Sequence, residues 1–253
     1  NMPKAIAFLR PHNRMFSKTT PHAKNLFEYR LYHLHPDKAP AFAKKVASTA
    51  DLRKSLVPLR LFTLPETGGE LHVASHLYFY KDGMEERNAA RAASQKNADW
   101  LSAVNDTRPD VRKQYSSIYN EAPQFVLDAA QCSGGDFVAP NSNPGIFEVR
   151  RYKLILGYDT VPAFMDMYAK GVEAKVLAGQ DEGTKLQTLM YNEIGELNEV
   201  IEIWRHEGVN GMARSRAMAR EAGEWKEAVG GIAKIAKSFT NTIHTPLVFS
   251  PWR

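Results

Sequence analysis

The stretch FEYRLY, residues 27–32, returns as FEVRRY at residues 147–152. Both copies share the frame Phe-Glu-x-Arg-x-Tyr. Three further pairs follow in the same order along the chain: Pro40-Ala41-Phe42 with Pro162-Ala163-Phe164, Gly69-Glu70-Leu71 with Gly195-Glu196-Leu197, and Asp99-Trp100 with Glu224-Trp225. Because four separate matches keep one order, the sequence predicts an internal duplication.

Each copy predicts the same series of secondary-structure elements. An alternating strand is followed by a helix, a pair of strands, a long helix and a last strand. The first copy places them at about 27–34, 36–51, 57–64, 70–80, 84–104 and 117–127, and the second at about 146–156, 159–178, 184–191, 196–206, 210–234 and 240–249. This βαββαβ order is the split ferredoxin-like unit, so the predicted fold class is α+β with two such repeats in tandem.

One ferredoxin-like unit covers one face of its sheet with helices and leaves the other face bare, and two units can pack their bare faces together. On the strands at 70–80 and 196–206, aliphatic residues alternate with polar and aromatic ones. The aliphatic set is Leu71, Val73, Leu77, Phe79, Leu197, Ile201 and Ile203, and the mixed set is His72, His76, Tyr78, Tyr80, Asn198, Glu202, Trp204 and His206. We assign the aliphatic face to the helices and the mixed face to the space between the sheets, which becomes a candidate pocket.

Composition sets wider limits. A chain of 253 residues, 43% of them hydrophobic, is long enough for one large core or two modest ones. Its single cysteine, Cys132, cannot close an internal disulfide or hold a structural zinc ion. No apolar run approaches the roughly 20 residues that cross a bilayer, so we expect no membrane span. The predicted organisation is a tail at 1–26, a first repeat at 27–128, a Gly-, Pro- and Ser-rich linker at 129–145 and a second repeat at 146–253.

The N-terminal tail has the composition of a mitochondrial presequence. It is basic and has no Asp or Glu before Glu28, whereas presequences are basic, hydroxylated and poor in acids. Arg14, Phe16 and Ser17 resemble a processing-peptidase site, and cleavage after Phe16 takes the formal charge from +5 to +2. The alternative is a basic tail with no targeting role. A nearly neutral mature domain argues against nucleic acid as a partner.

Several of these features together resemble the NipSnap family over residues 27–253. They are the repeated Phe-Glu-x-Arg-x-Tyr opening, the segment GELNEVIEIW at 195–204, the Arg-rich helix that ends in Glu224-Trp225, and the closing TPLVFSPWR. The resemblance implies a dimeric α+β barrel, here an intrachain barrel formed by the tandem repeats. It also implies a mitochondrial protein, in the matrix or associated with a membrane, that acts as an adaptor or sensor in mitochondrial quality control and vesicle traffic.

The resemblance carries over no catalytic residues. The family has a histidine where Glu202 stands here, while the first copy keeps His76 at the equivalent position. This departure argues against any function that needs a histidine from both copies.

The candidate pocket collects ionisable and aromatic residues from both copies. They are Glu28, Arg30, Tyr32, His72, His76, Tyr78, Glu148, Arg150, Tyr152, Asn198, Glu202 and Trp204. A carboxylate beside an arginine suits hydrogen-bonded recognition or proton transfer. The simpler interpretation is a set of internal Glu–Arg pairs that fix the strand register without a ligand, because charges in a low-dielectric interior must be paired wherever they occur.

Motifs for common enzymes and metal sites are missing from the sequence. It contains no G-x-S-x-G, P-loop, G-x-G-x-x-G or H-E-x-x-H motif. His72 and His76 lie roughly 13 Å apart on a strand, too far to ligate one metal ion, and we expect no metal site. Either histidine can act singly as a haem ligand, but this idea depends on fold analogy alone.

The function predicted from the sequence is that of a NipSnap-type adaptor or sensor that binds protein partners, with room for a small ligand between the sheets. No cofactor is expected, and a catalytic role is not favoured. The alternative is a haem-dependent or cofactor-independent oxygenase or isomerase that uses Glu28, Arg30, His76 and Glu202. Peripheral membrane association and a homo-oligomer both stay open.

Overall fold

The computed structural model describes residues 25–137, 144–179 and 183–253. Arg14, Phe16 and Ser17, the predicted processing site, lie outside these residues. In the described parts of the chain, no helix is both long enough and apolar enough to cross a membrane.

The first repeat follows the predicted order with two broken helices. Its elements are β1 (Leu26–Leu34), η1 (Pro36–Lys38), α1 (Ala39–Ser48), α2 (Ala50–Leu56), β2 (Leu59–Thr67), β3 (Val73–Tyr80), α3 (Gly83–Ser94), α4 (Ala98–Thr107), η2 (Arg108–Asp110) and β4 (Val111–Glu121). The predicted helix at 84–104 is divided because Asn97 has extended backbone geometry, and its side chain accepts a hydrogen bond from the Trp100 amide at 2.8 Å, which starts α4. Helix α5 (Gln124–Ala129) and η3 (Gly134–Asp136) follow.

The second repeat has one unbroken helix where the first has α1 and α2. Its elements are β5 (Ile146–Leu154), α6 (Thr160–Gly179), β6 (Lys185–Ile194), β7 (Glu199–His206), α7 (Val209–Glu221), α8 (Gly223–Ile235) and β8 (Ala236–Pro246). The predicted helix at 210–234 is two helices, because Ala222 adopts an extended conformation between α7 and α8.

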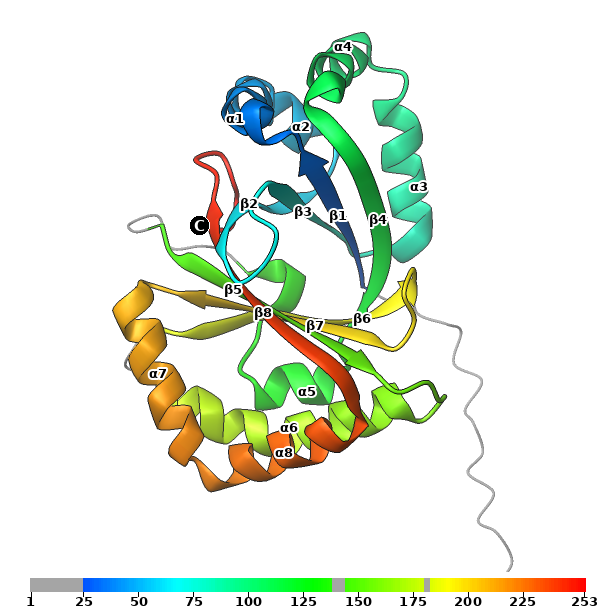
Figure 1. Ribbon diagram of the computed structural model, residues 1–253. Coiled ribbons are helices and arrows are strands. Elements are labelled where there is room, and N and C mark those ends of the chain that lie inside the picture. The colour runs from blue at the N-terminus through cyan, green and yellow to red at the C-terminus, as the bar shows by residue number, and fades with distance from the viewer. Residues whose placement is uncertain (1–24, 138–143, 180–182) are drawn as a thin grey trace, which may run out of the picture.

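The described strands close into one barrel in the order β1-β3-β2-β8-β5-β7-β6-β4 (Figure 1). The two repeats meet where β2 pairs with β8 and where β4 pairs with β6, both antiparallel. The register also repeats, because Glu28 lies opposite Tyr78 and Glu148 lies opposite Trp204. The predicted fold class, tandem ferredoxin-like repeats that form an intrachain α+β barrel, is confirmed.

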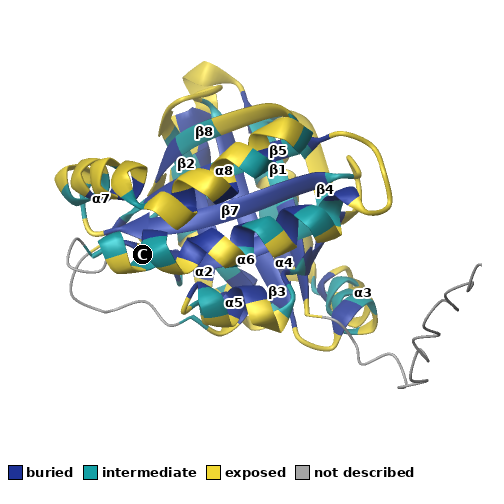
Figure 2. Cartoon of the chain, turned by 90° about the horizontal axis from the view of Figure 1, so that it is seen from below, coloured by how far each residue is buried: buried dark blue, intermediate teal, exposed yellow. Residues whose placement is uncertain are grey.

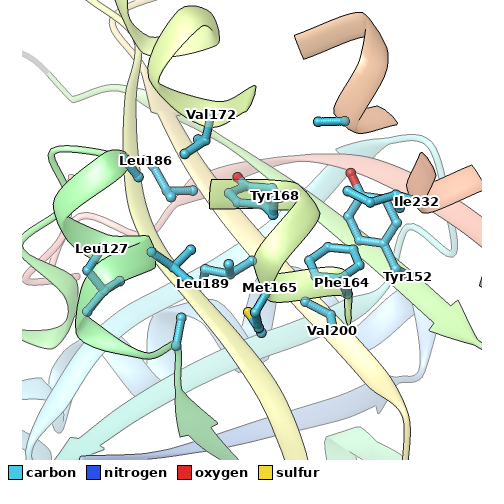
Figure 3. Close-up of a cluster of buried hydrophobic side chains, with 14 of the residues drawn as sticks. Leu127, Tyr152, Phe164, Met165, Tyr168, Val172, Leu186, Leu189, Val200 and Ile232 are labelled. Carbon is cyan, nitrogen blue, oxygen red and sulfur yellow. The ribbon is translucent and has the colours of Figure 1, made fainter. Parts of the chain in front are cut away.

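The predicted assignment of the sheet faces is wrong. The barrel interior between the two sheets holds the aliphatic face, with residues from both repeats that include Phe27, Leu77, Phe79, Phe147, Ile201 and Ile203. The mixed face lies outside, under the helices. In the second repeat, Tyr152 and Val200 pack with Phe164 and Tyr168 of α6 (Figure 3), and Trp204 belongs to the same cluster.

The physical reason lies in what each face can meet. Alternation along a strand shows that two faces differ, but it does not show which of them faces another sheet. A carboxylate on the helix-covered face can be paired by basic side chains that the helices supply, and buried charges need such partners. Strands β3 and β7 are buried along their whole length, because one face of each strand lies toward the barrel interior and the other lies under the helices (Figure 2).

Candidate functional site

Glu148 of β5 is the centre of a buried polar network in the second repeat. Its side chain is 1% exposed, and its carboxylate accepts hydrogen bonds from Arg150 at 2.5 Å and from Asn241 of β8 at 2.7 Å. His206 lies at 3.0 Å and Arg216 of α7 at 3.1 Å. Burial alone raises the pKa of Glu148, but His206 and Arg150 outweigh it and hold the pKa well below its usual range. Glu148 is therefore an anion whose oxygens are already occupied.

Glu202 of β7 forms a second network beside the first. It is completely buried and accepts hydrogen bonds from the hydroxyls of Tyr168 at 2.5 Å and Tyr152 at 2.8 Å. The indole of Trp204 donates at 2.8 Å and Arg150 at 3.3 Å. Arg150 thus joins both carboxylates, and both of the Glu202 oxygens have partners.

Lys175 of α6 is the cation above these carboxylates. Its Nζ lies 3.5 Å from the ring centre of Trp204, 4.7 Å from that of Trp225 and 3.9 Å from a Glu202 oxygen. The side chain is 5% exposed, yet Nζ has no hydrogen-bond partner in the described structure. Burial lowers the pKa of Lys175 to about 7, against the raising effect of Glu202. Burial has the opposite effect on Glu202 and raises its pKa, but Lys175 and Arg150 outweigh burial, so the pKa of Glu202 is lowered.

A cavity of about 310 Å³ opens between the second-repeat sheet and helices α6, α7 and α8; we call it the second-repeat pocket. Of the described residues that line it, four are cationic and Glu148 is the carboxylate. The cationic residues are Arg150, Lys175, Arg216 and Arg220, and the apolar ones include Trp225, Val229, Ile232, Ala236 and Phe239. The pocket therefore has a basic end and an apolar end.

The first repeat contains a related carboxylate network around Glu28. Arg91 and Arg87 of α3 bind its two oxygens at 2.8 and 3.1 Å, Ser116 of β4 donates at 2.9 Å, and Arg30 lies at 3.6 Å. Burial raises the pKa of Glu28, but Arg91 and Arg87 outweigh it and lower the pKa to about 2. Glu28 is thus a paired structural anion, as the simpler interpretation of the Glu–Arg pairs predicts.

His76, which corresponds to Glu202 in the repeat, is enclosed by aromatic rings. Its imidazole stacks on Phe62 with ring centres 4.0 Å apart, and Tyr32 lies at 4.4 Å. Nearby, Arg53 of α2 donates to the hydroxyl of Tyr78 at 2.8 Å. Burial lowers the pKa of His76 well below its usual value, and the surrounding arginines lower it further. His76 is a neutral side chain of the core.

The structure divides the predicted site residues among three places, so their convergence between the sheets is wrong. Glu148, Arg150, Tyr152, Glu202 and Trp204 meet in the second repeat, at or just below the second-repeat pocket. The first-repeat group of Glu28, Arg30, Tyr32, His76 and Tyr78 lies under its own helices. His72 and Asn198 lie in the turns that precede β3 and β7.

Three cationic residues of the pocket were missed from the sequence, Lys175, Arg216 and Arg220. A signal for Lys175 was available in the duplication. Lys175 follows Pro162-Ala163-Phe164 at the same spacing at which Arg53 follows Pro40-Ala41-Phe42. Both side chains lie over the matched tryptophans, Arg53 at 4.8 Å from the ring centre of Trp100 and Lys175 at 4.7 Å from that of Trp225.

A second cavity, which we call the α6 groove, lies at the other end of α6 and has a volume of about 900 Å³. Asn198 has a positive φ of 60° and donates to the backbone oxygens of Ile155 at 2.7 Å and Gly157 at 3.1 Å. These bonds tie the β6–β7 turn to the β5–α6 loop. The groove is bordered by exposed Phe125, Leu156, Tyr158 and Leu197.

Comparison with known proteins shows which family the chain belongs to. The NIPSNAP family model matches residues 27–124 and 147–251, which include both carboxylate networks. The chain belongs to the NIPSNAP family. Protein NipSnap homolog 3A of Homo sapiens is 25% identical over 226 residues, which cover 89% of this chain and 85% of the relative. Protein NipSnap homolog 3B of Homo sapiens is 24% identical over the same coverage. The family predicted from the sequence is confirmed.

Solved structures support the same fold for this NIPSNAP chain. A putative monooxygenase from Fusobacterium nucleatum has a TM-score of 0.62 at 11% identity, over 89% of this chain and 94% of that one. A putative monooxygenase from Lactobacillus acidophilus has a TM-score of 0.56 at 10% identity, over 88% and 94%. At these identities the likeness concerns the fold alone.

Proposed function

We propose that this NIPSNAP protein is an adaptor that binds a protein partner in the α6 groove. The observation that carries this proposal is the gathering of large apolar side chains around the groove at high exposure, with Leu156 75% and Leu197 59% exposed. Contiguous exposed apolar surface is typical of protein interaction sites. The Asn198 side chain holds the two loops that present these residues, which reduces the ordering cost of binding.

The charge of the groove indicates the chemistry of the partner. Among the described residues that line it, Asp166 and Glu193 are acidic and none is basic. A partner segment with apolar and basic side chains on one surface matches this lining, and an amphipathic helix presents them in that way. The proposed partner is therefore a protein with a basic amphipathic helix.

The test uses a synthetic amphipathic peptide of about 18 residues with leucine on one face and lysine on the other, and its glutamate counterpart. Fluorescence anisotropy with the full chain should give saturable binding of the lysine peptide and at least about tenfold weaker binding of the glutamate peptide. Leu197→Ser should weaken binding by about tenfold. Leu71→Ser is the matched control, since Leu71 is the exposed first-repeat equivalent of Leu197. Equal effects of the two variants would refute the groove as the binding surface.

The proposal also includes import of the protein into mitochondria. The acid-free basic segment before Glu28 and the site at Arg14, Phe16 and Ser17 support import into mitochondria. In an import assay with isolated mitochondria, the wild-type chain should be shortened and Arg14→Ala should stay uncut. Unchanged processing of this variant would contradict the proposed site.

The geometry does not favour the oxygenase alternative. Glu28, Arg30 and His76 lie under the first-repeat helices, whereas Glu202 bonds to Tyr168 of α6 in the second repeat. The four residues therefore do not form one site for one substrate.

The described histidines near these networks do not fit haem. His206 uses both ring nitrogens, one with Thr184 at 2.9 Å and one with Glu148 at 3.0 Å. His76 is fully buried between Phe62 and Tyr32, so no open space for a porphyrin lies beside its ring nitrogens in the described part of the chain. A haem ligand from either residue would require these contacts to break.

A further inference from the structure

We propose that the second-repeat pocket binds a small amphipathic carboxylate, with its anionic group on the Lys175 ammonium and its apolar body against Ile232, Ala236 and Phe239. This inference goes beyond the adaptor function and does not depend on the α6 groove. It assigns a ligand class to a cavity in which the basic groups exceed the acidic ones.

The first argument is the donor capacity of Lys175. An ammonium group carries three N–H donors, and the Nζ of Lys175 has no hydrogen-bond partner in the described structure although the side chain is 95% buried. The indoles of Trp204 and Trp225 stabilise its charge through their faces but accept no conventional hydrogen bond. Buried polar groups without partners are costly, so a ligand that accepts from Nζ removes this cost.

The second argument is that the carboxylates of the site are already fully used. Glu148 accepts from Arg150, His206 and Asn241, and Glu202 accepts from two tyrosine hydroxyls and an indole. A cationic ligand would find no free acceptor there, and it would face four basic side chains. An anionic ligand can accept hydrogen bonds from the Lys175 ammonium, whose N–H donors have no partner in the described structure.

The third argument concerns the other end of the pocket. Val229, Ile232, Ala236 and Phe239 line it with apolar surface, and Phe239 stacks on Tyr152 with ring centres 4.6 Å apart. A volume of about 310 Å³ is at the lower end of the range for ligand pockets, which selects a small molecule. A bare inorganic anion leaves the apolar end unfilled, whereas a carboxylate with a short aliphatic or aromatic body fills both ends.

The first repeat offers a built-in contrast. Arg53 occupies the position of Lys175, and it donates to Tyr78. In the first repeat, His76 stands at the position of Glu202, so Arg53 has no carboxylate neighbour equivalent to Glu202 among the described residues. The other carboxylate, Glu28, is paired with arginines from α3 and β1. Arg53→Met is therefore the matched control for Lys175→Met.

Binding should also depend on pH, since Lys175 must be protonated to hold the anion. Its pKa is lowered to about 7 in the free protein, so affinity should fall as the pH rises from 6 to 8. The groups that face Lys175 from the packed elements are Glu148, Arg150, Glu202, Tyr152, Tyr168, His206 and Arg216. The carboxylates of this set are already ionised in this interval because their pKa values are lowered.

The experiment compares three probes that share one apolar body: hexanoate, 1-hexanol and hexylamine. Isothermal titration calorimetry on the full chain at pH 6.5 should show hexanoate binding at least about tenfold more tightly than the other two. Lys175→Met should reduce hexanoate binding to the level of 1-hexanol, and Arg53→Met should leave it unchanged. Inorganic phosphate should bind more weakly than hexanoate.

Three results would overturn the proposal. They are equal binding of hexylamine, unchanged hexanoate binding by Lys175→Met, and phosphate binding as tight as that of hexanoate. A measurement on the wild-type protein covers the case in which the variant does not fold. NMR titration of the Lys175 side chain should show its pKa rising when hexanoate is added, and an unmoved pKa counts against the site. Loss of peptide binding in the groove leaves these readouts unaffected, so the two proposals fail separately.

Discussion

Replacement of Lys175 by methionine should change how the stability of the protein depends on pH. Lys175 is 5% exposed, and its pKa falls from 10.5 to about 7 on folding because burial penalises the ammonium. Methionine is similar in length, carries no charge and packs well against aromatic rings such as those of Trp204 and Trp225. The variant therefore removes one titrating group with little change in shape.

The expected magnitude follows from proton linkage. Because the folded pKa of Lys175 lies below the unfolded value, the unfolded chain binds more protons between pH 7 and pH 10.5. The free energy of unfolding of the wild type therefore rises with pH in this window, at most by about 1.4 kcal/mol per pH unit. From pH 7.5 to pH 9.5 the contribution of Lys175 is about 2–3 kcal/mol, and it is absent from Lys175→Met.

Urea unfolding at pH 7.5 and pH 9.5 measures this effect. The stability advantage of Lys175→Met over the wild type should shrink by about 2–3 kcal/mol between the two pH values. The matched control is Lys170→Met, since Lys170 is exposed on the same helix. A stability difference that stays constant within about 0.5 kcal/mol would refute the reasoning, because it would mean that Lys175 does not change its protonation on folding.

Three further predictions concern the carboxylate network and the groove. Glu28→Gln leaves the surrounding arginines without their anion and should lower the free energy of unfolding in urea by on the order of 3–5 kcal/mol. The control Glu66→Gln should change it very little, because Glu66 is exposed. Similar losses for the two variants would contradict the pairing of Glu28. Because the pKa of Glu28 is lowered from 4.5 to about 2, the gap between wild type and Glu28→Gln should hold from pH 7 to about 5 and narrow as the pH falls toward 2; a gap that narrows already near neutral pH counts against this pKa. Asn198→Ala should lower the free energy of unfolding more than Asn198→Gly, by about 1 kcal/mol at the thermal midpoint, because glycine adopts a φ of 60° with less strain than alanine. The reverse order in thermal unfolding would argue against that strain.

Some of the site was accessible from the sequence, and some of it was not. The duplication identified Glu148, Arg150 and Glu202 as members of one group, since strand alternation places Glu148 and Arg150 on one face and the repeat aligns their partner strand. Lys175 was accessible in principle through its match with Arg53. Arg216 was not, because nothing in the pattern of α7 shows that this arginine, rather than its neighbours, reaches Glu148 at 3.1 Å.

The sequence by itself determined the two repeats, their α+β class, their family and the alternation that separates an aliphatic face from a polar and aromatic one. Only the tertiary structure decided which face lies inside the barrel. Alternation is a local property of one strand, whereas the direction of a face depends on what the other repeat and the helices bring to it. Leu77 and Ile203 belong to one apolar cluster inside the barrel, while Glu148 and Glu202 turn outward to cations from α6 and α7. The basic end of the second-repeat pocket is therefore a tertiary feature, because Lys175 and Arg216 come from helices that are distant in sequence from Glu148.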